Sequence, residues 1–366
     1  MINRLVVNNL RHRPIRTGLS ILAVTMEVTM MLLIVGVADG LLEESQSRSR
    51  SIGADILIRP SSSSAAMTLS TADIPAKLAA FFPENYDEIE MAMGTTVSTQ
   101  GADLNTVTGV DWDAFTRMCG GIHFFSGEPP KESYDVVVDE VYARYKKVKV
   151  GDTLNLLNND FRVTGVVETG KLSRIFIPLQ TMQELMGWDG QFSQLFVKLR
   201  DPADTERMVK EISAQIPSYP VFAMEEFLSL VATDIRKWTS QFVYAIVAIA
   251  AVIGFLVVLL SMYTSILERT RQIGILKSLG ATNGFIVTVL MREVAVLCVV
   301  GIVVGIGAAY GIREGLRTGF PLLSILITRD WIVISALLAL AGAMLGAFYP
   351  ATRAARQDAI HALSYD

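Results

Sequence analysis

Residues 242–282 read FVYAIVAIAAVIGFLVVLLSMYTSILERTRQIGILKSLGAT, an apolar run followed directly by a charged segment. The apolar part, 242–266, is long enough for a helix to cross a bilayer, which takes about 20 residues. In the charged part, Ile273, Leu276 and Leu279 recur every third residue, and Gly280 is a typical residue to end a helix. The stretch predicts a membrane-spanning helix that leads into a short amphipathic helix.

Three further apolar segments have similar lengths, at 17–41, 286–312 and 331–349. The first is too long for the apolar region of a cleavable signal peptide, which usually has about 7–15 residues. Its end, 38–44, has the pattern of a helix that continues outward. The sequence therefore predicts a membrane protein with four transmembrane α-helices, and the long stretch between the first and second carries no such run.

Composition indicates that this long stretch is a water-soluble domain. The chain is 51% hydrophobic with a mean hydropathy of +0.41, yet 19% of its residues are charged, as expected when spans and a soluble domain share one chain. Residues 42–237 hold 28 acidic and 19 basic residues, whereas the remainder holds 8 acidic and 13 basic ones. No basic patch indicates nucleic-acid binding. Cys119 and Cys298 are expected to stay unpaired.

The orientation follows from the basic residues that flank the spans. Three basic residues lie in the short loop between the third and fourth spans: Arg313, Arg317 and Arg329. Nine lie on the other side: Arg4, Arg11, Arg13, Arg16, Arg269, Arg271, Lys277, Arg353 and Arg356. Because basic residues are retained on the cytoplasmic side, both termini and the 267–285 loop are predicted to be cytoplasmic, and 42–237 to lie outside.

The predicted extracytoplasmic domain, 42–237, has a mixed α/β pattern. Strand patterns occur at 55–59, 134–138, 153–157, 161–167, 175–177 and 194–199, and helix patterns at 179–186 and 205–216. Residues 238–366, which hold the other three predicted spans, are expected to form one membrane domain. Residues 1–16 are predicted to form a cytoplasmic amphipathic helix, with a plain basic tail as the alternative.

Residues 268–282 closely resemble the E-R-T-R-E-I-G-I-L-K-A-L-G-A-T motif of the MacB/FtsX family of ABC transporter permeases. Only Gln272 and Ser278 depart from the motif, and the resemblance implies that 238–366 is an FtsX-like permease domain. The ending 349–363 is similar to the family's ending, with Ala359 in place of a proline. Further stretches resemble the family's entry to the first span and its MacB-like periplasmic core domain: 9–19, 150–153, 161–166 and 177–179.

The resemblance implies a mechanism and partners. Members act as dimers, homo- or heteromeric, in the bacterial inner (plasma) membrane, each protomer with a cytoplasmic ABC ATPase and in some cases a periplasmic adaptor protein. ATP hydrolysis moves the outer domains through a coupling helix, which is called mechanotransmission. The coupling helix falls on 268–280 here, and the residues expected to couple to the ATPase are Glu268, Arg269, Arg271, Gly274, Lys277 and Gly280.

The sequence contains no G-x-x-x-x-G-K-[ST] phosphate-binding loop. The chain is therefore expected to be a non-catalytic subunit that binds no cofactor directly, with ATP used by a partner ATPase. The implied function is export or extraction (efflux) of a hydrophobic or amphipathic cargo such as a lipid, lipoprotein, antibiotic or haem. The alternative is an FtsX-like signalling permease that activates a cell-wall hydrolase without transport. The size of the outer domain favours transport.

Glu27 lies near the middle of the first span, where a carboxylate costs about 2.5–3.5 kcal/mol. Met30 and Met31, three and four residues on, are expected to share its helix face. Three interpretations stay open: a polar anchor for cargo entering laterally, a haem-iron site with Glu27 and either Met30 or Met31 as ligands, or a structural carboxyl that is protonated or paired near Arg292. No Cys/His cluster has metal-ligand spacing, so no other metal site is expected.

Three pairs of glycines stand four residues apart inside the predicted spans. They are Gly301 and Gly305, Gly307 and Gly311, and Gly342 and Gly346. Such pairs let two helix backbones approach closely. They predict either packing within one bundle or an interface between protomers.

Overall fold

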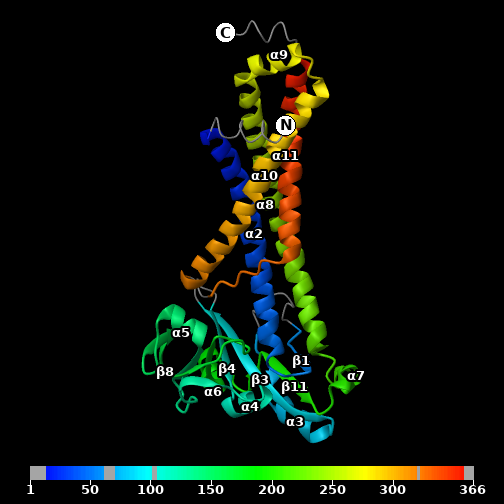
Figure 1. Ribbon diagram of the computed structural model, residues 1–366. Coiled ribbons are helices and arrows are strands. Elements are labelled where there is room, and N and C mark those ends of the chain that lie inside the picture. The colour runs from blue at the N-terminus through cyan, green and yellow to red at the C-terminus, as the bar shows by residue number, and fades with distance from the viewer. Residues whose placement is uncertain (1–13, 62–70, 101–104, 320–321, 358–366) are drawn as a thin grey trace. The chain divides into compact units, whose positions relative to one another are not determined.

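The computed structural model describes residues 14–61, 71–100, 105–319 and 322–357 (Figure 1). Most of the amphipathic helix expected at 1–16 lies outside these residues. The described chain forms two compact units. A helical unit comprises 14–40, 239–319 and 324–357, and an α/β domain comprises the described residues of 41–238 together with 322–323.

Four helices are long and apolar enough to cross a membrane. They are α2 (Pro14–Arg50), α8 (Met224–Glu268), α10 (Asn283–Gly319) and α11 (Arg329–Arg356). Each contains one of the predicted apolar segments. α8 begins well before the predicted span. Its first turns bury Met224 and Leu228 but are polar on the other side, so a search for apolar runs does not detect them.

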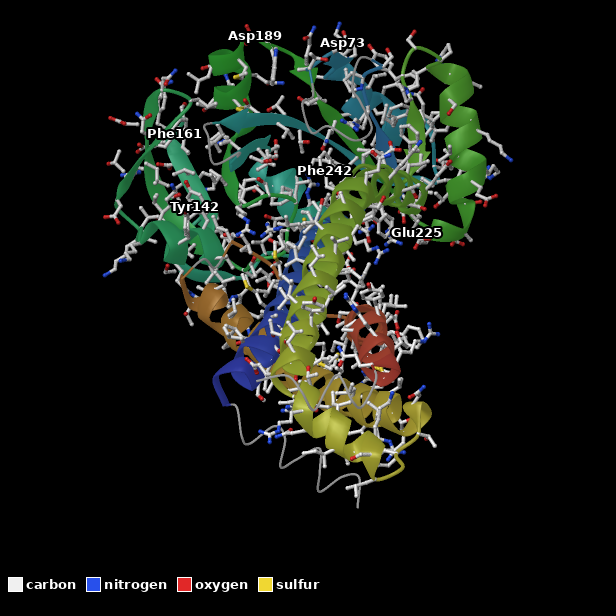
Figure 2. The ribbon with its side chains drawn as sticks, turned by 90° about the horizontal axis from the view of Figure 1, so that it is seen from above. Asp73, Tyr142, Phe161, Asp189, Glu225 and Phe242 are labelled. Atoms are coloured by element: carbon white, nitrogen blue, oxygen red, sulfur yellow. The ribbon has the colours of Figure 1, made fainter. Side chains whose placement is uncertain are left out.

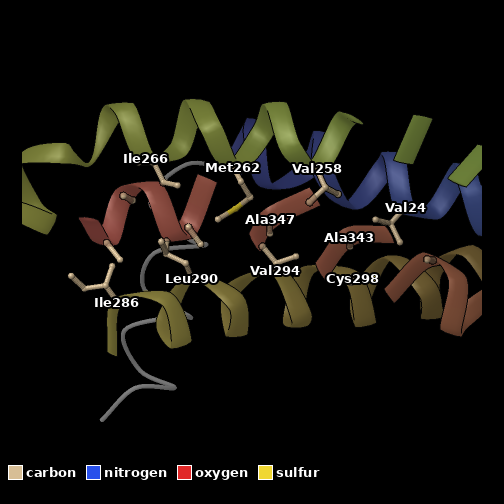
Figure 3. Close-up of a cluster of buried hydrophobic side chains, with 14 of the residues drawn as sticks. Val24, Val258, Met262, Ile266, Ile286, Leu290, Val294, Cys298, Ala343 and Ala347 are labelled. Carbon is tan, nitrogen blue, oxygen red and sulfur yellow. The ribbon is translucent and has the colours of Figure 1, made fainter. Parts of the chain in front are cut away.

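Small residues hold the helical unit together. Thr25 and Thr29 of α2 donate hydrogen bonds to the carbonyls of Gly301 (3.2 Å) and Gly305 (3.0 Å) of α10. Gly346 of α11 packs so closely on α8 that an added Cβ would lie 2.7 Å from the Phe255 carbonyl oxygen. The bundle core is a cluster of alanine and medium-sized aliphatic side chains, including Ala343, Ala347 and Val294 (Figure 3). Close backbone approach, more than side-chain bulk, therefore shapes this unit.

The glycine pairs differ in their surroundings. Gly301, Gly305 and Gly346 pack within the chain, as one of the two interpretations predicted. Gly307 and Gly311 are exposed, and a Cβ at either would meet nothing within 4 Å among the described residues.

The α/β domain is built on a sheet with the strand order β12-β1-β11-β3-β4-β9-β6-β8-β5, and β7 also pairs with β8. Pairing is parallel between β4 and β9 and between β6 and β8, and antiparallel elsewhere. The bounds are β1 Ile56–Ile58, β3 Ile89–Gln100, β4 Asn105–Val110, β5 Phe124–Gly127, β6 Asp135–Asp139, β7 Thr153–Leu156, β8 Asn159–Val167, β9 Ile175–Pro178, β11 Gln194–Leu199 and β12 Val221–Ala223. A small second sheet pairs β2 (Ile74–Pro75) with β10 (Gln191–Phe192).

Helices cover the sheet on both faces. They are α3 (Lys77–Asn85), α4 (Trp112–Met118), α5 (Glu140–Lys146), α6 (Leu179–Met186) and α7 (Thr205–Gln215), with a short 3-10 helix at Pro202–Asp204. Successive residues of β6 point to opposite faces. Val137 packs in a cluster with Phe115 of α4, while Val136 and Val138 pack in a different cluster with Tyr142 of α5. Figure 2 shows Tyr142 in the same part of the domain as Phe161 of β8, a member of that second cluster.

All six predicted strands and both predicted helices of the domain are present, which confirms those predictions. Two long central strands, β3 and β4, were not predicted, nor were the shorter elements β2, β5, β10, β12, α3, α4 and α5. The central positions of β3 and β4 are glycines and threonines that are fully buried, so neither strand shows the expected alternation of apolar and polar residues. Gly94 of β3 lies under the Phe192 ring and Gly109 of β4 lies against Met182, because no larger residue fits at these positions.

Candidate functional site

The predicted coupling segment forms a separate short helix, α9 (Thr270–Ser278). α8 ends at Glu268, and Arg269 leaves the helical conformation with φ −110° and ψ 10°. The Thr270 hydroxyl donates to the carbonyls of Ile266 and Leu267, both at 3.0 Å, and so closes the end of α8. Glu268 therefore belongs to α8, which corrects the predicted 268–280 range at its first residues.

The other end of α9 is a glycine cap, as the sequence predicted. Gly280 has φ +93°, a conformation that residues with a Cβ rarely adopt. Its N–H donates to the Lys277 carbonyl at 2.9 Å, and the Ala281 N–H donates to the Leu276 carbonyl at 3.0 Å. These two bonds form a Schellman motif, which ends the helix and turns the chain into α10.

Two contacts fix α9 to its neighbours. The Arg269 guanidinium makes an ion pair with Glu293 of α10 at 3.2 Å, and the two side chains are 12% and 5% exposed. The Lys277 ammonium donates to the Gln357 carbonyl, just past the end of α11, at 2.7 Å. Ile273 and Gly274 are buried in the bundle. α9 is thus attached to α10 and α11 rather than suspended in a loop.

The apolar residues of this segment do not share one face, and that part of the prediction is wrong. Ile273 is buried, whereas Ile275, Leu276 and Leu279 are 45%, 39% and 79% exposed. At about 100° per residue, a spacing of three residues turns by about 300°, so positions 273, 276 and 279 drift around the helix. Arg271 lies on the exposed side too. α9 therefore presents an apolar, basic surface away from the bundle.

Glu27 is buried inside the helical unit, with 7% of its surface exposed. Its carboxylate lies against Gly254 of α8, where an added Cβ would collide with Oε2. Among the described residues, Oε1 has no hydrogen-bond partner. Glycine at position 254 is what makes room for this carboxyl group.

Met30 and Met31 both neighbour Glu27 on α2, but they differ in burial. Met31 is buried at 3% exposure, whereas Met30 is 45% exposed. At about 100° per residue, Met30 and Met31 lie on opposite sides of Glu27 around the helix, so Met31 packs into the bundle and Met30 points out of it. Arg292, the suggested neighbour, is exposed, and Glu293 beside it takes Arg269 as its partner. No group of three or more potential metal ligands occurs among the described residues.

Sequence reasoning missed two features of this unit. One is the partnership of Glu293 with Arg269, and the other is the place of Gly254 against Glu27. A signal existed for the first, since a glutamate within an apolar segment and an arginine at the end of the preceding span are costly in lipid unless they pair. No sequence pattern indicated the second, because it depends on how two helices are aligned.

The comparisons with known proteins agree with this architecture. Residues 17–215 match the MacB-like periplasmic core domain, and residues 244–359 match the FtsX-like permease C-terminal domain. The Bacillus subtilis protein described as an uncharacterized ABC transporter permease, YknZ, is 33% identical over 56% of this chain and 52% of its own length. A macrolide export ATP-binding/permease protein, MacB, from Rhodospirillum rubrum is 25% identical over 97% of this chain and 59% of its own length.

The fold is also similar to a crystal structure of the periplasmic region of MacB from Actinobacillus actinomycetemcomitans. The match covers 50% of this chain and 94% of the crystallised chain. Its sequence identity to this chain is 15% and the TM-score is 0.39. The chain spans between about half and three fifths of the length of the curated relatives above.

The chain has an α/β domain between the first and second of four membrane-spanning helices and a short anchored helix between the second and third, and with these matches it is an ABC transporter permease. The match to the MacB-like periplasmic core domain alone covers more than half of the residues. This chain belongs to the MacB/FtsX family of these permeases, which confirms the resemblance found in the sequence.

Proposed function

We propose that this chain is the membrane subunit of an ABC export or extraction system, driven by a separate cytoplasmic ATPase. In this proposal ATP hydrolysis moves the α/β domain, which acts on a hydrophobic or amphipathic cargo outside the membrane. Both termini and α9 are cytoplasmic, as the distribution of basic residues supports. The chain itself is non-catalytic, and it works as a dimer, homo- or heteromeric.

The exposed apolar surface of α9 is the observation that carries the proposal. Ile275, Leu276 and Leu279 are exposed, and they lie in the loop that the distribution of basic residues favours as cytoplasmic, where a partner protein is a suitable neighbour. Exposed apolar residues with a polar surrounding mark protein–protein contacts. A helix of this kind fits into a groove on a partner by its apolar face.

The attachments of α9 support its use as a lever. A force on α9 reaches α10 through Arg269 and Glu293, and it reaches the end of α11 through Lys277. α8, which leads into Arg269, is one continuous helix from Met224 to Glu268. A continuous helix transmits a displacement along its axis, so movement at α9 is passed on along α8.

The proposal is tested by measuring how the chain stimulates its partner ABC ATPase in nanodiscs. Ile275→Asp and Leu279→Asp place charges on the exposed surface of α9 and are expected to abolish binding of the ATPase. Arg271→Glu and Gly280→Pro are expected to leave the α/β domain folded but to reduce ATPase stimulation at least about tenfold, the effect of losing about 1.4 kcal/mol of coupling.

Phe125→Asp is the matched control, since Phe125 is also exposed (56%) but belongs to the α/β domain. Unchanged stimulation of the ATPase in all four α9 variants would refute the role of α9. The partner that co-purifies on the other side of the membrane then separates export from signalling. A periplasmic adaptor supports export, whereas a peptidoglycan hydrolase supports the FtsX-like alternative.

A further inference from the structure

The α/β domain contains a cavity of about 490 Å³. One wall is a face of the sheet, formed by β1, β11, β3, β4 and β9. The other walls are the last turns of α2, from Leu41 to Ser49, and the first turns of α8, from Met224 to Ile235. Its volume lies within the range of about 300–1,000 Å³ that is typical of small-molecule sites.

Most of the cavity lining is apolar. Leu57, Phe196 and Val97 line it from the sheet, and Phe227, Leu228 and Val231 line it from α8. Leu57 and Phe196 are directly opposite each other on β1 and β11, so they form one continuous patch. A long aliphatic group would be removed from water on this patch, which is favourable in proportion to the area buried.

Three arginines are concentrated at the same cavity: Arg48, Arg59 and Arg174. Arg48 makes ion pairs with Asp139 (3.1 Å) and Glu44 (3.0 Å) and donates to the Ser173 carbonyl (3.1 Å). Arg174 makes an ion pair with the same Glu44 oxygen. The lining of the cavity thus holds three guanidinium groups and the carboxylate of Glu44. Burial, together with the neighbouring charge of Arg48, lowers the pKa of Arg174.

Two buried polar atoms at the cavity have hydrogen-bonding capacity left. Arg174 Nη1 and Thr108 Oγ1 are buried and have no hydrogen-bond partner among the described residues. Thr108 is fully buried on β4, opposite Val97 of β3. Buried polar groups are normally bonded, and an unbonded guanidinium donor is costly. A carboxylate or phosphate oxygen is the best partner for such a donor.

The source of the ligand follows from the helices that form the walls. The wall residues of α2 continue the apolar segment 17–41 in one helix, and those of α8 precede the apolar segment 242–266 in one helix. A molecule bound in the cavity therefore contacts residues that adjoin both apolar segments along the chain. A membrane amphiphile has the tail for the apolar walls and the head group for the arginines.

We propose that this cavity binds an amphiphile with a single anionic head group, carboxylate or phosphate, and an aliphatic tail. Arg174 and Arg59 bind the head group, and Leu57, Phe196 and Val231 contact the tail. As a statement about cargo, the inference rests on the export function proposed above. The binding itself requires no ATPase, so a failure of binding and a failure of ATPase coupling are measured separately.

The test is native mass spectrometry of the full chain in neutral detergent with palmitate, hexadecyl phosphate and the uncharged hexadecanol. Wild type is expected to bind both anions at one per chain, at least about tenfold more tightly than hexadecanol, since a charge-assisted hydrogen bond carries the difference. A preference between palmitate and hexadecyl phosphate identifies the source as a fatty acid or a phospholipid-type head group.

Two variants and two controls test the location. Val231→Trp narrows the cavity where the tail is proposed to lie, and it is expected to weaken binding of both anions at least about tenfold. Arg174→Gln keeps a donor for Glu44 but removes the charge, so it is expected to reduce the preference for anions over hexadecanol. The controls are Leu230→Trp, next to Val231 but exposed, and Arg200→Gln, an exposed arginine of the same domain.

Both controls are expected to bind as wild type does. Equal binding of hexadecanol and the anions by wild type would overturn the proposal, as would undiminished binding in Val231→Trp. Because Val231 is only half-buried on a helix, this variant keeps the test valid even if Arg174→Gln fails to fold.

Discussion

The helical unit and the α/β domain are held together in opposite ways. In the domain, large side chains fill the space between the sheet and its helices, and Phe115, Phe161 and Phe176 are fully buried. In the helical unit, the buried residues include many alanines and glycines, and the large apolar side chains are mostly exposed. Large buried side chains stabilise the domain, whereas the bundle depends on small residues that let its helices pack closely.

The sharpest test of this contrast removes bulk from the domain. Phe115 packs against Trp112 and Phe176, with ring centroids 5.8 Å and 5.1 Å away. Phe115→Ala is expected to lower the free energy of unfolding of the domain by about 3–5 kcal/mol, because it leaves a cavity that the sheet cannot close. Denaturant unfolding of the full chain, followed by tryptophan fluorescence, measures this change.

Phe125→Ala is the matched control. Phe125 lies in the same domain on β5 but is 56% exposed, so its loss is expected to change the free energy of unfolding by less than about 0.5 kcal/mol. If the two variants lost equal stability, the packed core around Phe115 would not be what holds the domain together.

The second test adds bulk to the helical unit. At Gly301 an added Cβ would lie 2.7 Å from the Val24 Cβ, and the Thr25 hydroxyl donates to the Gly301 carbonyl. Gly301→Leu is expected to force α2 and α10 apart and to cost about 1–3 kcal/mol. The readout is the thermal stability of the purified chain in detergent.

Gly307→Leu, on the same helix, gives the comparison. Gly307 is exposed, and a Cβ there would meet nothing within 4 Å in the described part of the chain. As a single protomer, the Gly307→Leu variant is expected to have the same thermal stability as wild type. A loss at Gly307 as large as the loss at Gly301 would show that the exposed glycines are packed as well, and the contrast between the two faces of α10 would fail.

The sequence predicted the helical unit well because one property, length of apolar run, dominates it. All four spans lie within helices, and the cap at Gly280 has the expected left-handed conformation. The amphipathic face of α9 was predicted wrongly, since its buried side is set by contacts with α10 and α11 and not by its own periodicity. Local spacing cannot show which side of a short helix meets its neighbours.

The domain was predicted only where strands are rich in β-branched and aliphatic residues, such as β6 and β11. β3 was missed because Gly94, Thr95 and Thr96 are buried by contacts that other strands and loops provide. The arginine-lined cavity was missed for the same reason. Arg48, Arg59 and Arg174 are far apart in the sequence, and only the sheet order brings β1 and β9 onto one face with the end of α2.

A third, smaller difference concerns charge, and Asp135 of β6 is its best example. Burial alone would raise the pKa of Asp135, whose exposure is 2%. Hydrogen bonds from the N–H groups of Glu132 (2.8 Å) and Lys131 (2.9 Å) and from the Arg162 guanidinium (3.1 Å) outweigh burial and hold its pKa below the ordinary value of 3.8. The folded domain therefore favours the charged carboxylate more than the unfolded chain does.

The sign of the pH dependence follows from that difference. A carboxyl group whose pKa is lower in the folded state contributes its full stabilisation above the unfolded pKa and loses it as the pH falls through the folded pKa. Wild type is thus expected to lose stability between neutral pH and about pH 3, and Asp135→Asn to lose less over that range. Arg162→Gln is expected to reduce the slope of stability against pH by part of the same amount, since it removes one of the three donors.

The loss of stability with acid is expected to be smaller than the losses caused by Phe115→Ala and Gly301→Leu. Tryptophan fluorescence during denaturant unfolding at each pH measures it. An acid slope in Asp135→Asn as steep as that of wild type would mean that the pH dependence of the domain arises from other groups, and that this buried strand end adds packing and hydrogen bonds but no linkage to protons.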